Sequence, residues 1–131
     1  MNNESYGKLT LSANFPITHA EQLRDLLLIV MRPHYAELYL SGREGTLFIS
    51  KTGDKAYLMF LRYYGDTGFH LINPNYDGPA DAMLELYMEN GQGDEKPLSE
   101  WTSVEEAQRV AEHFFLYGEK APWVSWHDDS Q

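Results

Sequence analysis

The sequence predicts a single α+β domain over residues 1–131, in which two helices cover a mostly antiparallel sheet of five to seven strands. Two segments begin with helix-capping signals and carry apolar residues at helical spacing. Between them, several strand-like segments are joined by short turns that contain glycine. Short connections favour antiparallel pairing, and no repeat or linker divides the chain.

The N-terminal part predicts one strand and one helix. Residues 8–15 are expected to form an opening strand that ends at the following proline. Thr18 and Glu21 form an S/T-x-x-E capping box, whose two side chains can bond backbone N–H groups at the start of a helix. Apolar residues then recur on one side as far as position 31. Pro33 ends this helix, because the residue before a proline is pushed away from helical geometry.

The middle of the chain predicts consecutive strands joined by hairpin turns. Residues 55–64 are apolar on both faces, which is typical of a central strand. A loop rich in proline, glycine and asparagine follows at 74–82. Residues 83–89 then alternate and predict another strand, whereas the polar residues 90–97 predict a loop. The other expected strands lie at 36–41, 46–51 and 69–73.

The segment from position 100 onward predicts a second amphipathic helix. Ser103 and Glu106 form a second capping box. The helix that follows places Ala107, Phe114 and Phe115 on one apolar stripe. These residues are therefore expected to cap the helix and to fill the core.

A tight turn and a short strand are expected after this helix. Gly118 stands where a left-handed residue commonly ends a helix. Residues 123–126 predict a final strand that ends on a core tryptophan, Trp126. Their expected role is structural.

The charge of the chain is strongly negative and unevenly distributed. The net charge is −10, and residues 66–131 alone hold fourteen acidic and three basic side chains. Such a field disfavours direct binding to nucleic acid or to an anionic membrane. It favours a basic protein partner, because opposite charges accelerate encounter. A negative charge that serves only solubility is the alternative.

Motifs for catalysis or for metal binding are absent from the sequence. The chain has no cysteine, so disulfides, a thiol nucleophile and a thiolate zinc site are excluded. Its five histidines match no metal-binding spacing, and no nucleophile elbow, P-loop or dinucleotide motif occurs. We therefore expect no enzyme, metal or cofactor, although a site assembled from distant segments leaves no local trace. The N-terminal residues lack the pattern of a secretory signal, so a cytoplasmic protein is expected.

Tyrosines beside acidic residues predict a protein-binding face. Tyrosine suits interfaces because it buries a large area at low entropic cost and keeps a hydroxyl for hydrogen bonding. Tyr39 shares a predicted strand face with Glu37, and the alternative is that such tyrosines pack against a covering element. The predicted contact residues are Tyr76, Asp77, Asp81, Glu85, Tyr87, Glu89, Asp94 and Glu95.

The C-terminal segment resembles the first of the immunity-protein families of bacterial polymorphic toxin systems. The similarity covers about thirty residues and consists of three pieces. In this family a proline directly follows the basic residue of G-E-[RK]-P, whereas this chain has Ala121 and then Pro122. The pieces read SVEEA at 103–107, FFLYGEK at 114–120 and VSW at 124–126.

The resemblance implies a small cytoplasmic protein that binds and neutralises a cognate toxin domain without catalysis. Family members share a scaffold and meet different toxins, including nucleases and nucleic-acid deaminases. An acidic inhibitor could occupy the basic cleft of such a toxin in a one-to-one complex. Two other readings stay open at this point: an acidic adaptor that binds another basic protein, and an enzyme with a dispersed site.

Overall fold

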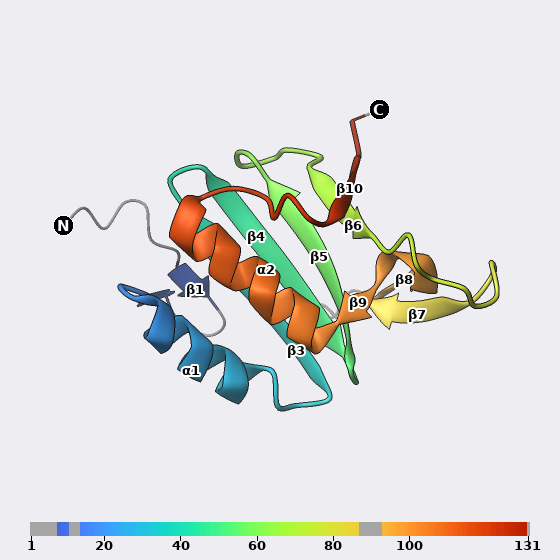
Figure 1. Cartoon of the computed structure of the whole chain (residues 1–131), viewed down its shortest axis with the longest axis horizontal. Coiled ribbons are helices and arrows are strands. Elements are labelled where there is room, and N and C mark those ends of the chain that lie inside the picture. Colours follow the sequence, from blue (N-terminus) through green and yellow to red (C-terminus); the bar gives the residue numbers. More distant parts are fainter. Residues whose placement is uncertain (1–7, 11–13, 87–92, 131) are drawn as a thin grey trace.

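The computed structural model describes residues 8–10, 14–86 and 93–130, and these form an α+β domain (Figure 1). Helices α1 (Ala20–Val30) and α2 (Val104–Tyr117) lie together over one face of the main sheet. A small second sheet, made of β7 (Met83–Leu86) and β8 (Asp94–Pro97), lies beyond the end of α2 at which that helix begins. The predicted fold class is confirmed.

The main sheet is antiparallel at every pairing that the structure describes. Seven strands follow one another in the order β10-β6-β5-β4-β3-β1-β2, and the two-residue β9 adds an eighth beside β5. The longest strands lie in the centre. The bounds are β1 Lys8–Thr10, β2 Asn14–Pro16, β3 Tyr35–Gly42, β4 Gly45–Thr52, β5 Lys55–Leu61, β6 Phe69–Ile72, β9 Thr102–Ser103 and β10 Ser125–Asp128.

The single opening strand expected at residues 8–15 is wrong, because two strands occupy this part of the chain. β1 pairs with β2, and Lys8 is opposite Pro16. Pro16 therefore lies within β2, the last strand of the order, where an edge position tolerates a residue without an N–H. Period-two alternation does not show where a chain reverses direction, so the sequence did not separate the two strands.

Helix α1 is confirmed, but its predicted cap lies one residue too early. His19 is the N-cap, and its Nδ1 accepts a hydrogen bond from the backbone N–H of Gln22 at 3.2 Å. The Gln22 side chain in turn accepts from the backbone N–H of Thr18 at 2.9 Å. The pair Thr18 and Glu21 is therefore replaced by an equivalent arrangement shifted along the chain. Both Thr18 and His19 carry a side-chain atom that can accept a hydrogen bond from a backbone N–H, and His19 is the residue that caps the helix.

Helix α2 begins and ends where the sequence predicts. The Ser103 hydroxyl accepts from the Glu106 backbone N–H at 3.0 Å, and Gly118 adopts φ 70° and ψ 20° after the last turn. The second half of the expected capping box is absent from the described contacts. The carboxylate of Glu106 instead accepts from the indole N–H of Trp123 at 2.6 Å.

The first core cluster lies between the helices and the main sheet. Ala107, Phe114 and Phe115 of α2 are buried in it, as predicted. Phe114 packs edge-on against Phe60 of β5, with ring centroids 5.9 Å apart. A bidentate ion pair between Arg24 and Glu112, at 2.7 and 2.9 Å, links the outer faces of the two helices. The helices thus form one cover over the sheet.

The second core cluster lies on the opposite face of the main sheet. Neighbouring residues of β4 belong to different clusters, Phe48 to the second and Ile49 to the first, because strand side chains alternate between faces. Trp101, which is 1% exposed, anchors the second cluster. Tyr39 packs against Phe48 in this cluster, and Glu37 is buried as well. The expectation that Tyr39 and Glu37 form part of an exposed binding face is therefore wrong.

The predicted loop at 90–97 contains a strand, which is a further correction. Leu84 and Leu86 of β7 pack into the second cluster, and β8 pairs with β7 through backbone bonds. The sequence of β8, Asp-Glu-Lys-Pro, has no apolar alternation, so only the neighbouring strand defines it. Pro97 ends this edge strand.

The final strand begins two residues later than predicted. Pro122 and Trp123 form a turn, and β10 starts at Ser125. Trp126 packs against the first cluster and is half-buried, and its indole N–H donates to the carbonyl of Ala121 at 3.0 Å. Ala121 is fully buried at the position where the resembled family has proline.

We predict that replacing Phe114 by alanine lowers the free energy of unfolding by about 3–5 kcal/mol, since the side chain is 2% exposed. Urea unfolding followed by tryptophan fluorescence would measure the change. Leu116→Ala on the same helix is the matched control, because Leu116 is 52% exposed. The control should change stability by less than about 0.5 kcal/mol. Equal losses for the two variants would contradict this packing.

Candidate functional site

Exposed acidic residues occur in the loop before β7 and in the β7–β8 hairpin, and we call this set the acidic surface. It consists of the carboxylates of Asp77, Asp81, Glu85, Asp94 and Glu95, all of which belong to exposed residues. Asp77, Asp81 and Glu95 have no ion-pair partner among the residues that the structure describes. The structure therefore leaves much of this negative charge available to another molecule.

The hairpin places two like charges opposite each other. Glu85 of β7 and Glu95 of β8 are register partners. Directly opposed like charges destabilise an antiparallel pair. The Tyr35 hydroxyl donates a hydrogen bond to Glu85 Oε1 at 3.3 Å. The Glu85 charge in turn raises the pKa of the Tyr35 phenol.

Asp94 differs from its acidic neighbours because the fold stabilises its charge. The backbone N–H of Glu95 donates to Asp94 Oδ1 at 2.8 Å, and Lys96 Nζ lies 3.5 Å from Oδ2. The backbone hydrogen bond and the nearby ammonium lower the pKa of Asp94. Its carboxylate is thus ionised over a wider range of pH than an ordinary aspartate.

The predicted contact residues include two tyrosines, Tyr76 and Tyr87, and the structure describes only Tyr76. The Tyr76 hydroxyl donates to the carbonyl of Pro79 at 2.7 Å, so this side chain folds back onto its own loop. An added Cβ at Gly78 would lie 2.6 Å from the Tyr76 oxygen, so a side chain there would require the Tyr76 ring to shift. Tyr87 and Glu89 lie outside the described residues. Their part in a binding surface stays a prediction.

A polar cluster around His70 was not found from the sequence. His70 Nδ1 lies 2.7 Å from Asp129 Oδ1, and Nε2 lies 3.3 Å from Glu100 Oε2. The ring also stacks on Tyr57, with centroids 6.1 Å apart and planes at 15°. These residues come from β5, β6, the turn before β9 and the C-terminal end. No local motif could reveal such a combination.

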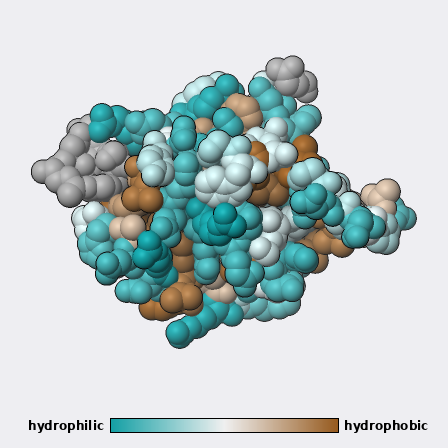
Figure 2. Space-filling model, viewed as in Figure 1, coloured by the Kyte–Doolittle hydropathy of each residue, from teal (hydrophilic) through white to brown (hydrophobic). Residues whose placement is uncertain are grey.

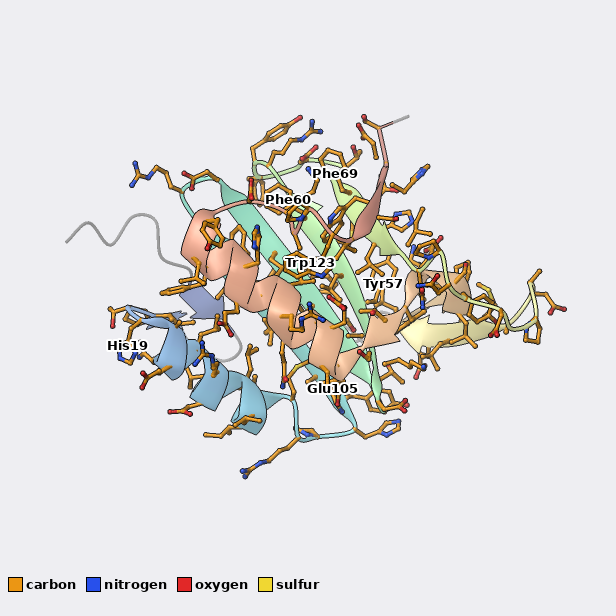
Figure 3. The ribbon with its side chains drawn as sticks, viewed as in Figure 1. His19, Tyr57, Phe60, Phe69, Glu105 and Trp123 are labelled. Atoms are coloured by element: carbon orange, nitrogen blue, oxygen red, sulfur yellow. The ribbon has the colours of Figure 1, made fainter. Side chains whose placement is uncertain are left out.

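The His70 cluster lines a cavity of about 490 Å³, which we call the His70 cavity. Glu95 and Lys96 of β8 also line it, so it adjoins the acidic surface. Tyr57, labelled in Figure 3, is 2% exposed. Burial, together with the charges of Glu100 and Asp129, raises the pKa of Tyr57 well above that of an ordinary phenol. The phenol is therefore neutral at physiological pH.

A larger cavity, of about 850 Å³, lies where the β3–β4 and β5–β6 turns meet. Tyr63 and Tyr64 line it and are strongly exposed. Arg62 forms a bidentate ion pair with Asp66, with distances of 2.8 and 2.9 Å, and the Asp66 side chain is only 1% exposed. The strand predicted over 55–64 ends at residue 61, so Tyr63 and Tyr64 lie in the following turn. Two adjacent tyrosines at the end of the predicted strand are the signal that could have drawn attention to this surface.

Exposed apolar side chains also occur near the end of α2. Trp123 is 47% exposed, and its ring contacts His113 edge-on at 5.1 Å and the Arg109 guanidinium at 5.5 Å. In the view of Figure 2, hydrophilic residues dominate this face and small hydrophobic patches lie between them. Scattered apolar groups of this kind are normal on a protein surface.

Within residues 8–10, 14–86 and 93–130, no group of three or more ligand side chains is placed to hold a metal ion. Neither described helix has the length and apolar character needed to cross a bilayer.

Comparisons with known proteins add no family assignment. No protein-family model matches this chain, and a search of curated proteins found no match. The resemblance of the C-terminal segment to an immunity-protein family thus stays a prediction.

We predict that Asp66 makes stability depend on pH in acid. The hydrogen bonds from the Arg62 side chain and from the backbone N–H groups of Arg62 and Gly68 lower the pKa of Asp66. A lowered pKa stabilises the fold fully above the unfolded value of about 3.9, and the contribution is lost as the pH falls towards the folded value. Asp66→Asn should therefore differ most from the parent protein near neutral pH.

Urea unfolding of both proteins at neutral and at strongly acidic pH would measure this difference. The exposed Asp54 provides a matched control, because Asp54→Asn removes the same charge in another turn. The Asp66→Asn difference should shrink in acid, whereas that of the control should stay small throughout. A difference for Asp66→Asn that does not change with pH would contradict the prediction.

Proposed function

We propose that this protein is a cytoplasmic immunity protein that binds a basic toxin domain through its acidic surface. The complex is one-to-one, and inhibition occurs by occlusion of the toxin's basic cleft without catalysis or a cofactor. A nuclease or a nucleic-acid deaminase fits this partner, because enzymes that act on nucleic acid present positive charge to phosphate. The resemblance of the C-terminal segment supports the immunity function, and the acidic surface supports the binding mode.

The observation that carries the proposal is the opposition of Glu85 and Glu95 on the hairpin. Two carboxylates at this position repel each other in the isolated protein. A basic partner would relieve this repulsion on binding, so the arrangement favours the complex over the free state. The same charges would steer a basic partner into encounter before contact is made.

An acidic adaptor for another basic protein is the second candidate, because it would use the same surface. Gene context separates the two candidates, since an immunity gene is expected directly downstream of a large toxin gene. The two functions otherwise predict the same electrostatic behaviour in vitro.

The polar cluster around His70 is the feature that would favour an enzyme. A general base must have a nitrogen within reach of the proton that it takes from a substrate. Both ring nitrogens of His70 already lie within 3.3 Å of a carboxylate oxygen. This arrangement suits a role in holding the carboxylates better than a role in proton transfer.

Charge reversal on the acidic surface should slow association with the toxin domain. We expect Asp77→Lys combined with Asp81→Lys to reduce the association rate constant by about tenfold or more at low salt, because steering can raise such rates by several powers of ten. Stopped-flow fluorescence at several salt concentrations would measure the rate, and the effect should fade as salt screens the charges.

The matched control carries Glu21→Lys and Asp25→Lys on α1, which change the net charge equally at exposed positions. This control should associate more nearly like the parent protein, and urea unfolding should show that both variants fold. Equal slowing by the two double variants would reduce the effect to overall charge and remove Asp77 and Asp81 from the interface.

Co-expression with the toxin domain encoded next to this gene tests the function itself. The protein should restore the growth of cells that express the toxin domain, and the two proteins should co-purify in equal amounts. Rescue should be weaker for the Asp77 and Asp81 double variant. Failure of both rescue and co-purification would overturn the immunity function.

A further inference from the structure

The His70 cavity adjoins the acidic surface and is rich in carboxylates. Glu95, Glu100 and Asp129 all line it. Its volume of about 490 Å³ lies within the ~300–1,000 Å³ that small-ligand sites commonly have. Glu95 belongs to both the cavity and the acidic surface, so a partner that covers the surface also reaches the cavity entrance.

The ring of His70 lies between two of these carboxylates. Each contributes one oxygen to the imidazole, Asp129 through Oδ1 and Glu100 through Oε2. An ionised carboxylate can accept several hydrogen bonds, so the second oxygen of each group keeps its capacity. The Asp129 backbone N–H also donates to the carbonyl of Gly68 at 2.9 Å, which fixes the chain that carries this carboxylate.

The Tyr57 hydroxyl is a further polar group of this cavity, independent of the carboxylates. Tyr57 is 98% buried, since its exposed fraction is 2%, yet its hydroxyl makes no hydrogen bond to any described residue. Every fully enclosed side-chain nitrogen or oxygen among the described residues has a hydrogen-bond partner. The Tyr57 oxygen is therefore not fully enclosed, and Tyr57 is one of the residues that line the His70 cavity.

We propose that the His70 cavity receives one arginine side chain of the basic partner, with Glu100, Asp129 and Tyr57 as its hydrogen-bond acceptors. A guanidinium presents five N–H donors in a plane and can bond several acceptors at once. The neutral Tyr57 oxygen accepts one of these donors, and the two carboxylates balance the charge. This inference rests on the proposed function only for the origin of the arginine.

The negative environment of the cavity is consistent with a cationic occupant. Lys96 also lines the cavity, with Nζ 5.8 Å from the centre of the Tyr57 ring and 3.5 Å from Asp94. This ammonium forms an ion pair with Asp94. Charged hydrogen bonds to a buried acceptor are stronger than neutral ones, so Tyr57 should contribute substantially to binding.

The test is a titration of the full chain with Nα-acetyl-arginine amide, followed by protein NMR. Saturable shifts are expected for the backbone amides of residues 57, 70, 100 and 129. Nα-acetyl-citrulline amide, which is nearly isosteric but neutral, should cause none. Tyr57→Phe should weaken the arginine compound about tenfold, because it removes a hydrogen bond to a charged group. Tyr35→Phe removes a hydroxyl outside the cavity and should leave the affinity unchanged.

Three results would overturn the inference: no saturable shift with the arginine compound, an equal response to citrulline, or unchanged affinity in Tyr57→Phe. Thermal unfolding of Tyr57→Phe shows whether the variant folds, and Glu100→Gln gives a second test of the same acceptor set. Nα-acetyl-lysine amide should bind more weakly than the arginine compound, and equal binding of the two would also count against a guanidinium site.

The outcome separates this inference from the proposed function, because the titration uses no toxin. If the arginine compound binds but the toxin domain is neither bound nor neutralised, the cavity site stands and the immunity function fails. If the toxin is bound and neutralised equally by the parent protein and by Tyr57→Phe, and the arginine compound does not bind, only the cavity inference fails.

Discussion

The structure depends on the burial of both faces of the central strands. In β4, neighbouring side chains such as Phe48 and Ile49 point to opposite sides, and both are buried. A sheet that is apolar on both faces cannot leave either face in water without losing much of its hydrophobic stabilisation. Helices α1 and α2 cover one face, and the β7–β8 hairpin contributes to the cover of the other. The hairpin therefore belongs to the fold as much as to the candidate site.

The same constraint turns Glu85 and Glu95 of the hairpin away from the second cluster. Leu84 and Leu86 point into the second cluster, so Glu85 between them must point the other way. The antiparallel register then places Glu95 directly opposite. The opposition of Glu85 and Glu95 is thus a consequence of alternation in a strand whose apolar side is required for packing. This coupling allows a stable core to carry an electrostatically unfavourable surface.

Features governed by a few neighbouring residues were predicted well. The Ser103 cap and the left-handed Gly118 are set by local backbone chemistry, and both are confirmed. Where several neighbouring residues could cap a helix, the prediction from the sequence selected the wrong one, because His19 and not Thr18 caps α1. The carboxylate of Glu106 likewise bonds Trp123, which lies after the helix and could not be placed beforehand.

The sequence by itself determined the α+β class, the two helices, the central strands and the concentration of negative charge, because periodicity, caps and composition are local properties. Only the tertiary structure decided which polar strand would pair with β7, and which tyrosines would be covered. It alone brought Tyr57 and His70 beside Glu100 and Asp129. Those positions are far apart in the chain, and their contact follows from how the strands and the C-terminal end pack. Long-range packing carries no signature in any single segment.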